Sequence, residues 1–139
     1  MTSLTSGLPD TVGADEDLAR FLTQSGHFTV RQVRPSAFLP SRTSRDTSVS
    51  RHGREPLDAL VSLGREAAGD RSLYGVALFK GRDVHAAGLE VVPDEPPARH
   101  AVIRKWPWFD DDPEEQKAQQ KERALMLASA AGAPLLFKA

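Results

Sequence analysis

Three parts of the chain have helical patterns: apolar residues recur at helical spacing in the first two, and the third is polar in its first half and apolar in its second. In the first, residues 15–25, several apolar residues fall on one helical face, and the acidic residues at its start suit the positive end of a helix dipole. The other two, 56–68 and 113–131, each begin with a proline and are each followed by a glycine, as helices prefer. The sequence therefore predicts three helices, the last one capped by Asp112, and a short helical turn at 81–84.

The segments between these helices alternate apolar and polar residues, or are rich in the residue types that favour strands. Strands are predicted at 27–33, 47–51, 73–79, 89–92, 99–105 and 134–137. This order of elements favours an α+β fold, in which about three helices pack on one face of a mostly antiparallel sheet. Residues 1–14 are polar and aperiodic, so we expect a mobile N-terminal tail followed by a single α+β domain over 15–139.

Composition narrows the class of protein. The 139 residues include no cysteine, which excludes a disulfide scaffold, thiol catalysis and a cysteine-ligated zinc site. The histidines lack partners at metal-binding spacing, and we expect neither a metal nor a cofactor. There is no signal-peptide pattern and no run near the ~18 apolar residues of a membrane span, so we expect a soluble, cytoplasmic protein without membrane contact. The net charge of −1 argues against a protein that coats nucleic acid.

Positive charge is concentrated in residues 31–54. This segment contains six arginines and one aspartate, although the net charge of the whole chain is −1. The arginines are Arg31, Arg34, Arg42, Arg45, Arg51 and Arg54, and the aspartate is Asp46. Serine and threonine hydroxyls lie between them, so the segment could hold the phosphate groups of a nucleotide or a nucleic acid. The alternative is a solvated loop that pairs with the acidic segment 110–115.

Arginine and histidine stand next to each other twice, as Arg51-His52 and as Arg99-His100. Both pairs lie at the ends of predicted strands. If these strands are neighbours, the arginines could hold an anion while the histidines act as acid and base, which is phosphoester chemistry. The alternative is that all four residues are exposed at the rim of the sheet.

Three of the nine aromatic residues of the chain fall within four positions, at Trp106, Trp108 and Phe109. If buried, they would close one end of the core. If partly exposed, they would anchor an interface, since tryptophan is enriched at binding hot spots. The sequence leaves both possibilities open.

Short motifs recur along the chain in an order that resembles a bacterial family. They are AF-x-P at 37–40, SV-x-RH at 48–52 and HA-x-I-x-x-WP at 100–107. Over about residues 20–131, the chain resembles a loose family of short uncharacterised bacterial proteins that carry these motifs in this order. The resemblance implies that the three segments form one module. It also implies an accessory protein that acts beside a larger protein, in a bacterial defence or toxin system.

The sequence as a whole favours a non-enzymatic accessory or binding protein whose partner is another protein. The predicted binding surface consists of Arg42, Arg45, Arg51, Arg54, His100, Trp106, Trp108 and Phe109. The first alternative is a small phosphoester-processing or nucleotide-binding enzyme that uses the two pairs Arg51-His52 and Arg99-His100. The second alternative is an RNA- or DNA-binding module in which arginines hold phosphates and a tryptophan stacks on a base.

Overall fold

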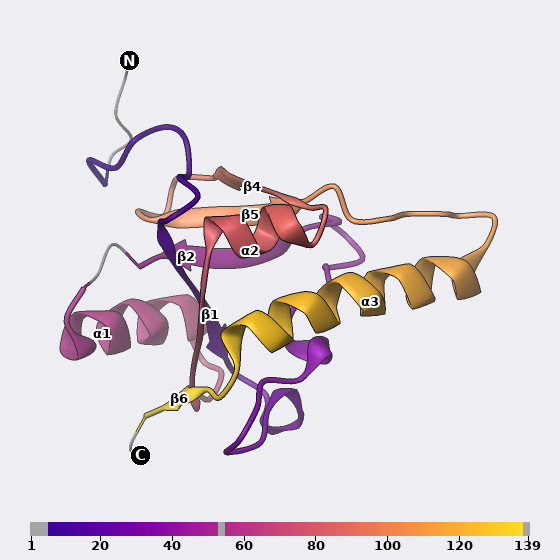
Figure 1. Ribbon diagram of the computed structural model, residues 1–139. Coiled ribbons are helices and arrows are strands. Elements are labelled where there is room, and N and C mark those ends of the chain that lie inside the picture. The colour runs from indigo at the N-terminus through magenta and orange to yellow at the C-terminus, as the bar shows by residue number, and fades with distance from the viewer. Residues whose placement is uncertain (1–5, 53–54, 138–139) are drawn as a thin grey trace.

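The computed structural model of the chain describes residues 6–52 and 55–137. Within these residues, six strands form one sheet in the order β4–β5–β2–β1–β3–β6, and all neighbouring strands are antiparallel (Figure 1). The strands are β1 (Asp17–Leu22), β2 (Thr47–Arg51), β3 (Gly75–Lys80), β4 (Glu90–Pro93), β5 (His100–Arg104) and β6 (Leu135–Leu136). The helices are α1 (Leu57–Ala68), α2 (Gly81–Ala86) and α3 (Pro113–Ala131), with short 3-10 turns η1 (Ser25–His27) and η2 (Pro35–Ala37). The predicted α+β fold class is confirmed.

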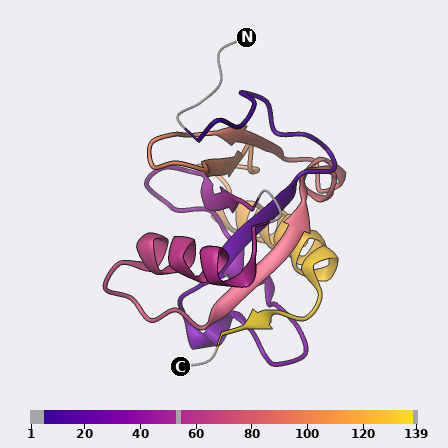
Figure 2. The ribbon, with the colours of Figure 1, turned by 90° about the vertical axis from the view of Figure 1, so that its left-hand side faces the viewer.

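Helices cover both faces of this sheet. Leu18 and Leu22 of β1 belong to a large core, to which α2 and α3 contribute. Ala19 and Phe21 point to the opposite face, where they join Leu60 of α1 in a smaller core. Figure 2 shows α1 and α3 on opposite sides of β1 and β3. The structure thus places α1 across the sheet from α2 and α3, whereas the sequence places all helices on one face.

Helix α1 covers only part of its face, because it packs on β1 and β3 through the smaller core. A Cβ atom at Gly64 would lie 2.7 Å from the ring of Phe21, so this glycine lets α1 approach β1 closely. On the same face, Ala19 pairs with Ser50 of β2, which in turn pairs with His100 of β5. His100 is only half-buried, so the β2–β5 part of this face is accessible beside α1.

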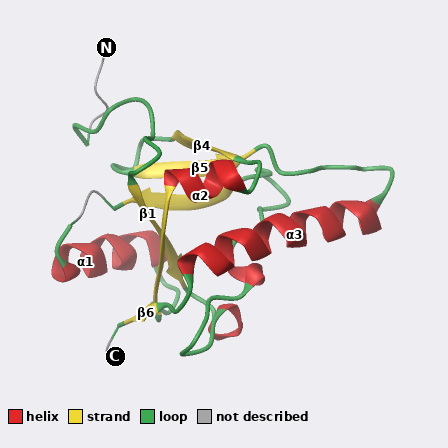
Figure 3. Ribbon diagram, in the orientation of Figure 1, coloured by secondary structure: helices red, strands yellow, loops and turns green. Residues whose placement is uncertain are grey.

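Residues 15–33 differ from the prediction. The segment predicted as a helix over 15–25 forms β1, and the segment predicted as a strand over 27–33 is mostly loop, with one isolated bridge between Phe28 and Val33 (Figure 3). Strand β1 lies inside the sheet with apolar cores on both faces. A strand buried on both faces has a near-continuous run of apolar residues, and a short run of this kind does not distinguish a strand from a helix.

The helix ends follow their local signals. The side chain of Asp112 accepts a hydrogen bond from the backbone nitrogen of Glu115 (3.1 Å) and so caps α3. Gly69 and Gly132 follow α1 and α3 with φ angles of 59° and 66°, which glycine adopts without strain. The strands predicted at 47–51, 73–79, 89–92, 99–105 and 134–137 are present with small shifts of their ends.

The segment 6–14, which the sequence predicts as part of a mobile tail, lies against the sheet. Val12 is buried in the large core. Two backbone carbonyls of the segment accept hydrogen bonds from Arg51 of β2. The rest of the predicted tail, residues 1–5, lies outside the described residues.

Candidate anion-binding site

The ladder between the two central strands is interrupted. Strands β1 and β2 pair at only two positions, Leu18 with Arg51 and Ala19 with Ser50. By contrast, β1 and β3 pair along the whole of β1. The two strands therefore diverge after Ala19, and backbone groups beyond this point need other partners.

Arg20 supplies these partners from the position where the pairing stops. Its Nε donates a hydrogen bond to the carbonyl oxygen of Ala37 (2.8 Å), and its Nη1 donates one to the carbonyl oxygen of Ser48 (2.8 Å). An arginine side chain thus replaces part of the strand ladder. A consequence is that one guanidinium group is held in a fixed place between β1 and β2.

A small pocket of about 70 Å³ lies between this part of the sheet and the end of α1, and we refer to it as the anion pocket. Its polar lining residues are Arg20, Thr23, Ser48, Ser50, Arg71 and His100, and its other lining residues are Phe21, Val49, Ala67 and Ala68. Among the described residues, no aspartate or glutamate lines it. At about 30 Å³ per water molecule, its volume suits a group of phosphate or carboxylate size.

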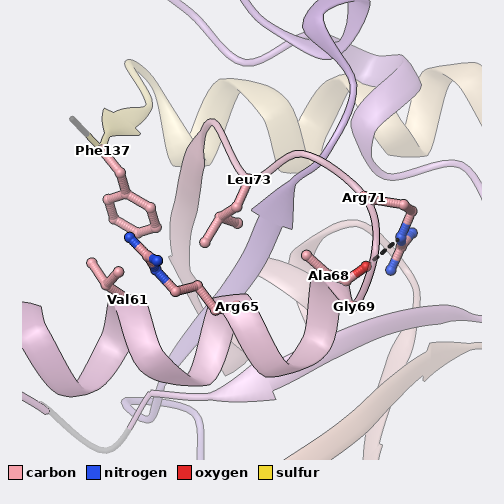
Figure 4. Close-up of a pocket in the computed structure, with 7 residues that line it drawn as sticks. All are labelled: Val61, Arg65, Ala68, Gly69, Arg71, Leu73 and Phe137. Carbon is pink, nitrogen blue, oxygen red and sulfur yellow. Dashed lines mark hydrogen bonds between the residues drawn. The ribbon is translucent and has the colours of Figure 1, made fainter. Parts of the chain in front are cut away.

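Arg71 stands at the end of α1, three residues after the last helical residue. Its Nε donates a hydrogen bond to the carbonyl oxygen of Ala68 (3.1 Å; Figure 4). Its Nη2 donates one to the carbonyl oxygen of Ala67 (2.9 Å), and neither carbonyl has a partner within the helix. These bonds hold the guanidinium at the pocket wall. Its Nη1 donates no hydrogen bond to the residues that the structure describes, so it is available to a ligand.

The electrostatic environment of the pocket is positive. Burial, and to a lesser extent the charge of Arg71, lower the pKa of Arg20 from its ordinary value to about 10. Burial likewise lowers the pKa of His27 below its usual 6.5, and the nearby charge of Arg20 acts in the same direction. Two cations that repel each other are stabilised by an anion placed between them, and no carboxylate from residues 6–52 or 55–137 lines the pocket to play this part.

His100 is oriented by Asp94, which precedes β5. Its Nδ1 lies 2.9 Å from the carbonyl oxygen and 3.2 Å from a carboxylate oxygen of Asp94. Both of these atoms are acceptors, so Nδ1 carries the proton. The other ring nitrogen, Nε2, can then accept a hydrogen bond or, when the ring is protonated, donate one. Ser50 lies directly opposite His100 on the neighbouring strand.

The two Arg-His pairs do not converge on one site. Arg51 is fully buried and forms an ion pair with Glu16. It pairs with Leu18 on the large-core side of the sheet, whereas its neighbour Ser50 points to the side of His100. Arg51 therefore lies on the other side of the sheet from His100, and it does not line the anion pocket.

Arg99 links the start of β5 to the end of β2, and the His52 side chain closes a local turn, so neither lines the anion pocket. Arg99 forms an ion pair with Glu55, and its Nη1 donates hydrogen bonds to the carbonyl oxygens of Arg51 (3.2 Å) and His52 (3.1 Å). The Nδ1 atom of His52 accepts a hydrogen bond from the backbone nitrogen of Glu55 (3.1 Å). Of the four Arg-His candidates, only His100 lines the anion pocket.

The predicted aromatic and arginine-rich surface is divided. Trp106 is 5% exposed and donates its indole hydrogen bond to the carbonyl of Ile103 (3.2 Å), so it is a core residue. Trp108 and Phe109 are half-buried. The guanidinium carbon of Arg45 lies 4.8 Å from the centre of the Trp108 ring.

Within the described residues, one ion pair joins the arginine-rich segment 31–54 to the acidic segment 110–115. Arg45 lies 3.7 Å from a carboxylate oxygen of Asp110, in the pairing that the sequence offered as the alternative to phosphate binding. Arg42 is exposed, and Arg54 lies outside the described residues. Neither Arg42 nor Arg45 lines the anion pocket.

Sequence reasoning missed the two arginines of the anion pocket. Arg20 interrupts an apolar run within a segment that was predicted as a helix, and Arg71 follows the glycine that ends α1. A charged residue within an apolar run signals a buried charge with dedicated partners. That signal marks Arg20 as unusual, but its location between β1 and β2 follows only from the divergence of these strands in the structure.

Comparisons of this chain with protein-family models, with curated proteins and with solved structures give no match. In the described part of the chain, none of the helices combines the length and the apolar character that crossing a membrane requires.

Proposed function

We propose that this chain is a binding protein that recognises an anionic group, a phosphate or a carboxylate, in the anion pocket between α1 and the β2–β5 part of the sheet. The observation that carries the proposal is the lining of the pocket. Two arginines, a histidine and three hydroxyl-bearing residues meet there, and none of the described residues that line the pocket is acidic.

The chemistry of these groups suits an oxyanion. Guanidinium groups donate several hydrogen bonds in a fixed plane and stay charged at neutral pH, and hydrogen bonds between charged groups are the strong ones. Arg20 and Arg71 are already held by backbone carbonyls, so little side-chain freedom is lost when they bind a ligand. The pocket is small, so the anion would be one part of a larger ligand.

An accessory role beside a larger bacterial protein, as implied by the family resemblance, belongs to the same proposal. In that setting the chain would bind its anionic ligand in the cytoplasm and act through a protein partner. Arg45 and Trp108, which contact each other away from the anion pocket, are its candidate partner contacts.

Calorimetric titration with inorganic phosphate at constant ionic strength tests the proposal. We expect Arg71→Gln to weaken binding roughly 10- to 100-fold, because it removes a charged hydrogen-bond donor. Arg42→Gln is the matched control, since Arg42 is exposed and lies outside the pocket. Equal losses in the two variants, or no binding by the wild type, would contradict the proposal. Acetate in place of phosphate distinguishes a carboxylate site from a phosphate site.

A second candidate function is phosphoester hydrolysis, and the contact between His100 and Asp94 favours it. His100 Nε2 would accept a proton from water while the water oxygen forms a bond to phosphorus and the ester P–O bond breaks; the proton then passes to the leaving alcohol. With p-nitrophenyl phosphate as substrate, this candidate requires turnover that His100→Gln abolishes and that His85→Gln, an exposed histidine of α2, leaves unchanged. Absence of turnover in the wild type would leave the binding function alone.

A further inference from the structure

A larger groove lies beside the anion pocket, between α1 and the C-terminal strand. Its volume is about 410 Å³, within the range of small-molecule sites. The residues that line it are Val61, Arg65, Ala68, Gly69, Arg71, Leu73 and Phe137. Figure 4 shows that the side chains of Arg65 and Phe137 lie next to each other above α1, with Leu73 facing them from the loop that follows.

The groove and the anion pocket meet at the end of α1, because Ala68 and Arg71 line both of them. Arg71 therefore stands at the junction. The groove brings three apolar side chains, Val61, Leu73 and Phe137, while the anion pocket brings hydroxyls and charges. Among the described residues, neither cavity has an acidic lining residue. An anionic ligand that extends across both would therefore meet no negative charge.

We propose that the ligand is a small organic anion, with its phosphate- or carboxylate-sized head in the anion pocket and its apolar body in the groove along Phe137. This inference rests on the proposed function. The head would contact Arg20 and His100, Arg71 would bind it at the junction, and Arg65 would shield the outer side of the body. Because the anion pocket is polar and charged and the groove has apolar side chains, the ligand can lie across them in one direction only.

A series of alkyl phosphates tests this ligand class. Methyl, butyl and hexyl phosphate carry the same head and differ only in the apolar body. We expect the dissociation constant to fall along the series by about fourfold for each methylene that enters the groove. Arg71→Gln should weaken all three ligands by a similar factor, because it acts on the head.

Substitutions in the groove should affect only the contribution of the ligand's apolar body to binding. We expect Phe137→Ala to remove most of the gain of hexyl over methyl phosphate while it leaves methyl phosphate binding unchanged. Leu136→Ala is the matched control, because Leu136 is the preceding residue, is 39% exposed and lies outside the groove. Since Phe137 also contacts the smaller core, Val61→Trp serves as a second variant that fills the groove from α1 without deleting a core side chain.

The outcomes separate the two proposals. If hexyl and methyl phosphate bind equally well, or if the gain survives both Phe137→Ala and Val61→Trp, the groove does not hold the body and the inference is overturned, although the anion pocket stands. If neither inorganic phosphate nor any alkyl phosphate binds, the proposed function has failed, and the inference fails with it. Chain-length dependence that both groove variants abolish supports the inference.

Discussion

Replacement of Arg51 by methionine tests whether the most deeply buried charge of the fold is structural. The Arg51 side chain is 0% exposed and donates four hydrogen bonds. Two of them reach the carboxylate of Glu16, and the others reach the carbonyl oxygens of Pro9 (2.6 Å) and Thr11 (3.4 Å). Methionine fills much of the same space but donates nothing, so both carbonyls lose this donor and Glu16 loses its cationic partner, keeping the hydrogen bond from the backbone nitrogen of Gly13 (3.3 Å).

The expected cost follows from the burial of the group left behind. Removal of one member of a buried ion pair costs about 3–5 kcal/mol, because the remaining charge stays desolvated. The Glu16 side chain keeps 18% exposure, so water offsets part of this cost, and we expect a loss of about 3 kcal/mol in the free energy of unfolding. For a domain of this size, roughly 4 °C per kcal/mol gives a melting temperature about 12 °C lower.

Urea unfolding followed by tryptophan fluorescence, to which the buried Trp106 and the half-buried Trp108 both contribute, measures this loss. The double variant Glu16→Leu/Arg51→Met should recover most of it, since no charge then remains unpaired, whereas Glu16→Leu alone should be as damaging as Arg51→Met. A loss below about 1 kcal/mol for Arg51→Met would refute the reasoning, because an unpaired carboxylate at that site would then carry no cost.

Three further predictions concern stability. Asp112→Ala should cost about 1 kcal/mol in urea unfolding, because it removes the cap of α3, with Asp111→Ala as the control. Gly64→Ala should lower the free energy of unfolding by about 1 kcal/mol despite its gain in helix propensity, since its Cβ would meet the Phe21 ring at 2.7 Å. The control is Ser62→Ala on the exposed side of α1, which should be neutral. A Gly64→Ala variant that is more stable than the wild type would contradict the close packing of α1 on β1. Since the pKa of His27 is lowered in the folded state, its neutral form contributes stability above pH 6.5 that is lost as the pH falls through the folded-state pKa. Between pH 7.5 and 5, His27→Gln should lose less melting temperature than the wild type, and equal losses would contradict this.

Local signals in the sequence predicted the helix ends and, of the six strands in the described residues, all except β1. Asp112 and Gly132 bound α3 because capping depends on residues close in sequence. Strand β1 could not be recognised in the same way, because its apolar positions reflect two cores that form only when the chain has folded. Its arginine, Arg20, was missed for the same reason.

The candidate site was predicted in part. The proximity of the two Arg-His pairs was expected on condition that their strands are neighbours, and β2 and β5 do pair, with Ser50 opposite His100. The alternation of side chains along a strand then separates Arg51 from His100, and this depends on register rather than on sequence neighbours. Arg71 reaches the same pocket from the C-terminal end of α1. This contact between distant segments cannot be predicted from any local sequence pattern.

The divergence of β1 and β2 makes the sheet two half-sheets that meet along a seam, β4–β5–β2 on one side and β1–β3–β6 on the other. The anion pocket lies on this seam. Arg20 and α1 belong to one half, and Ser50 and His100 belong to the other. A bound anion would therefore contact both halves and stabilise their association. The backbone amides along the seam should then exchange with deuterium more slowly when phosphate is present. If the anion pocket binds its ligand as proposed, occupancy of the site and the cohesion of the sheet would be coupled in one equilibrium.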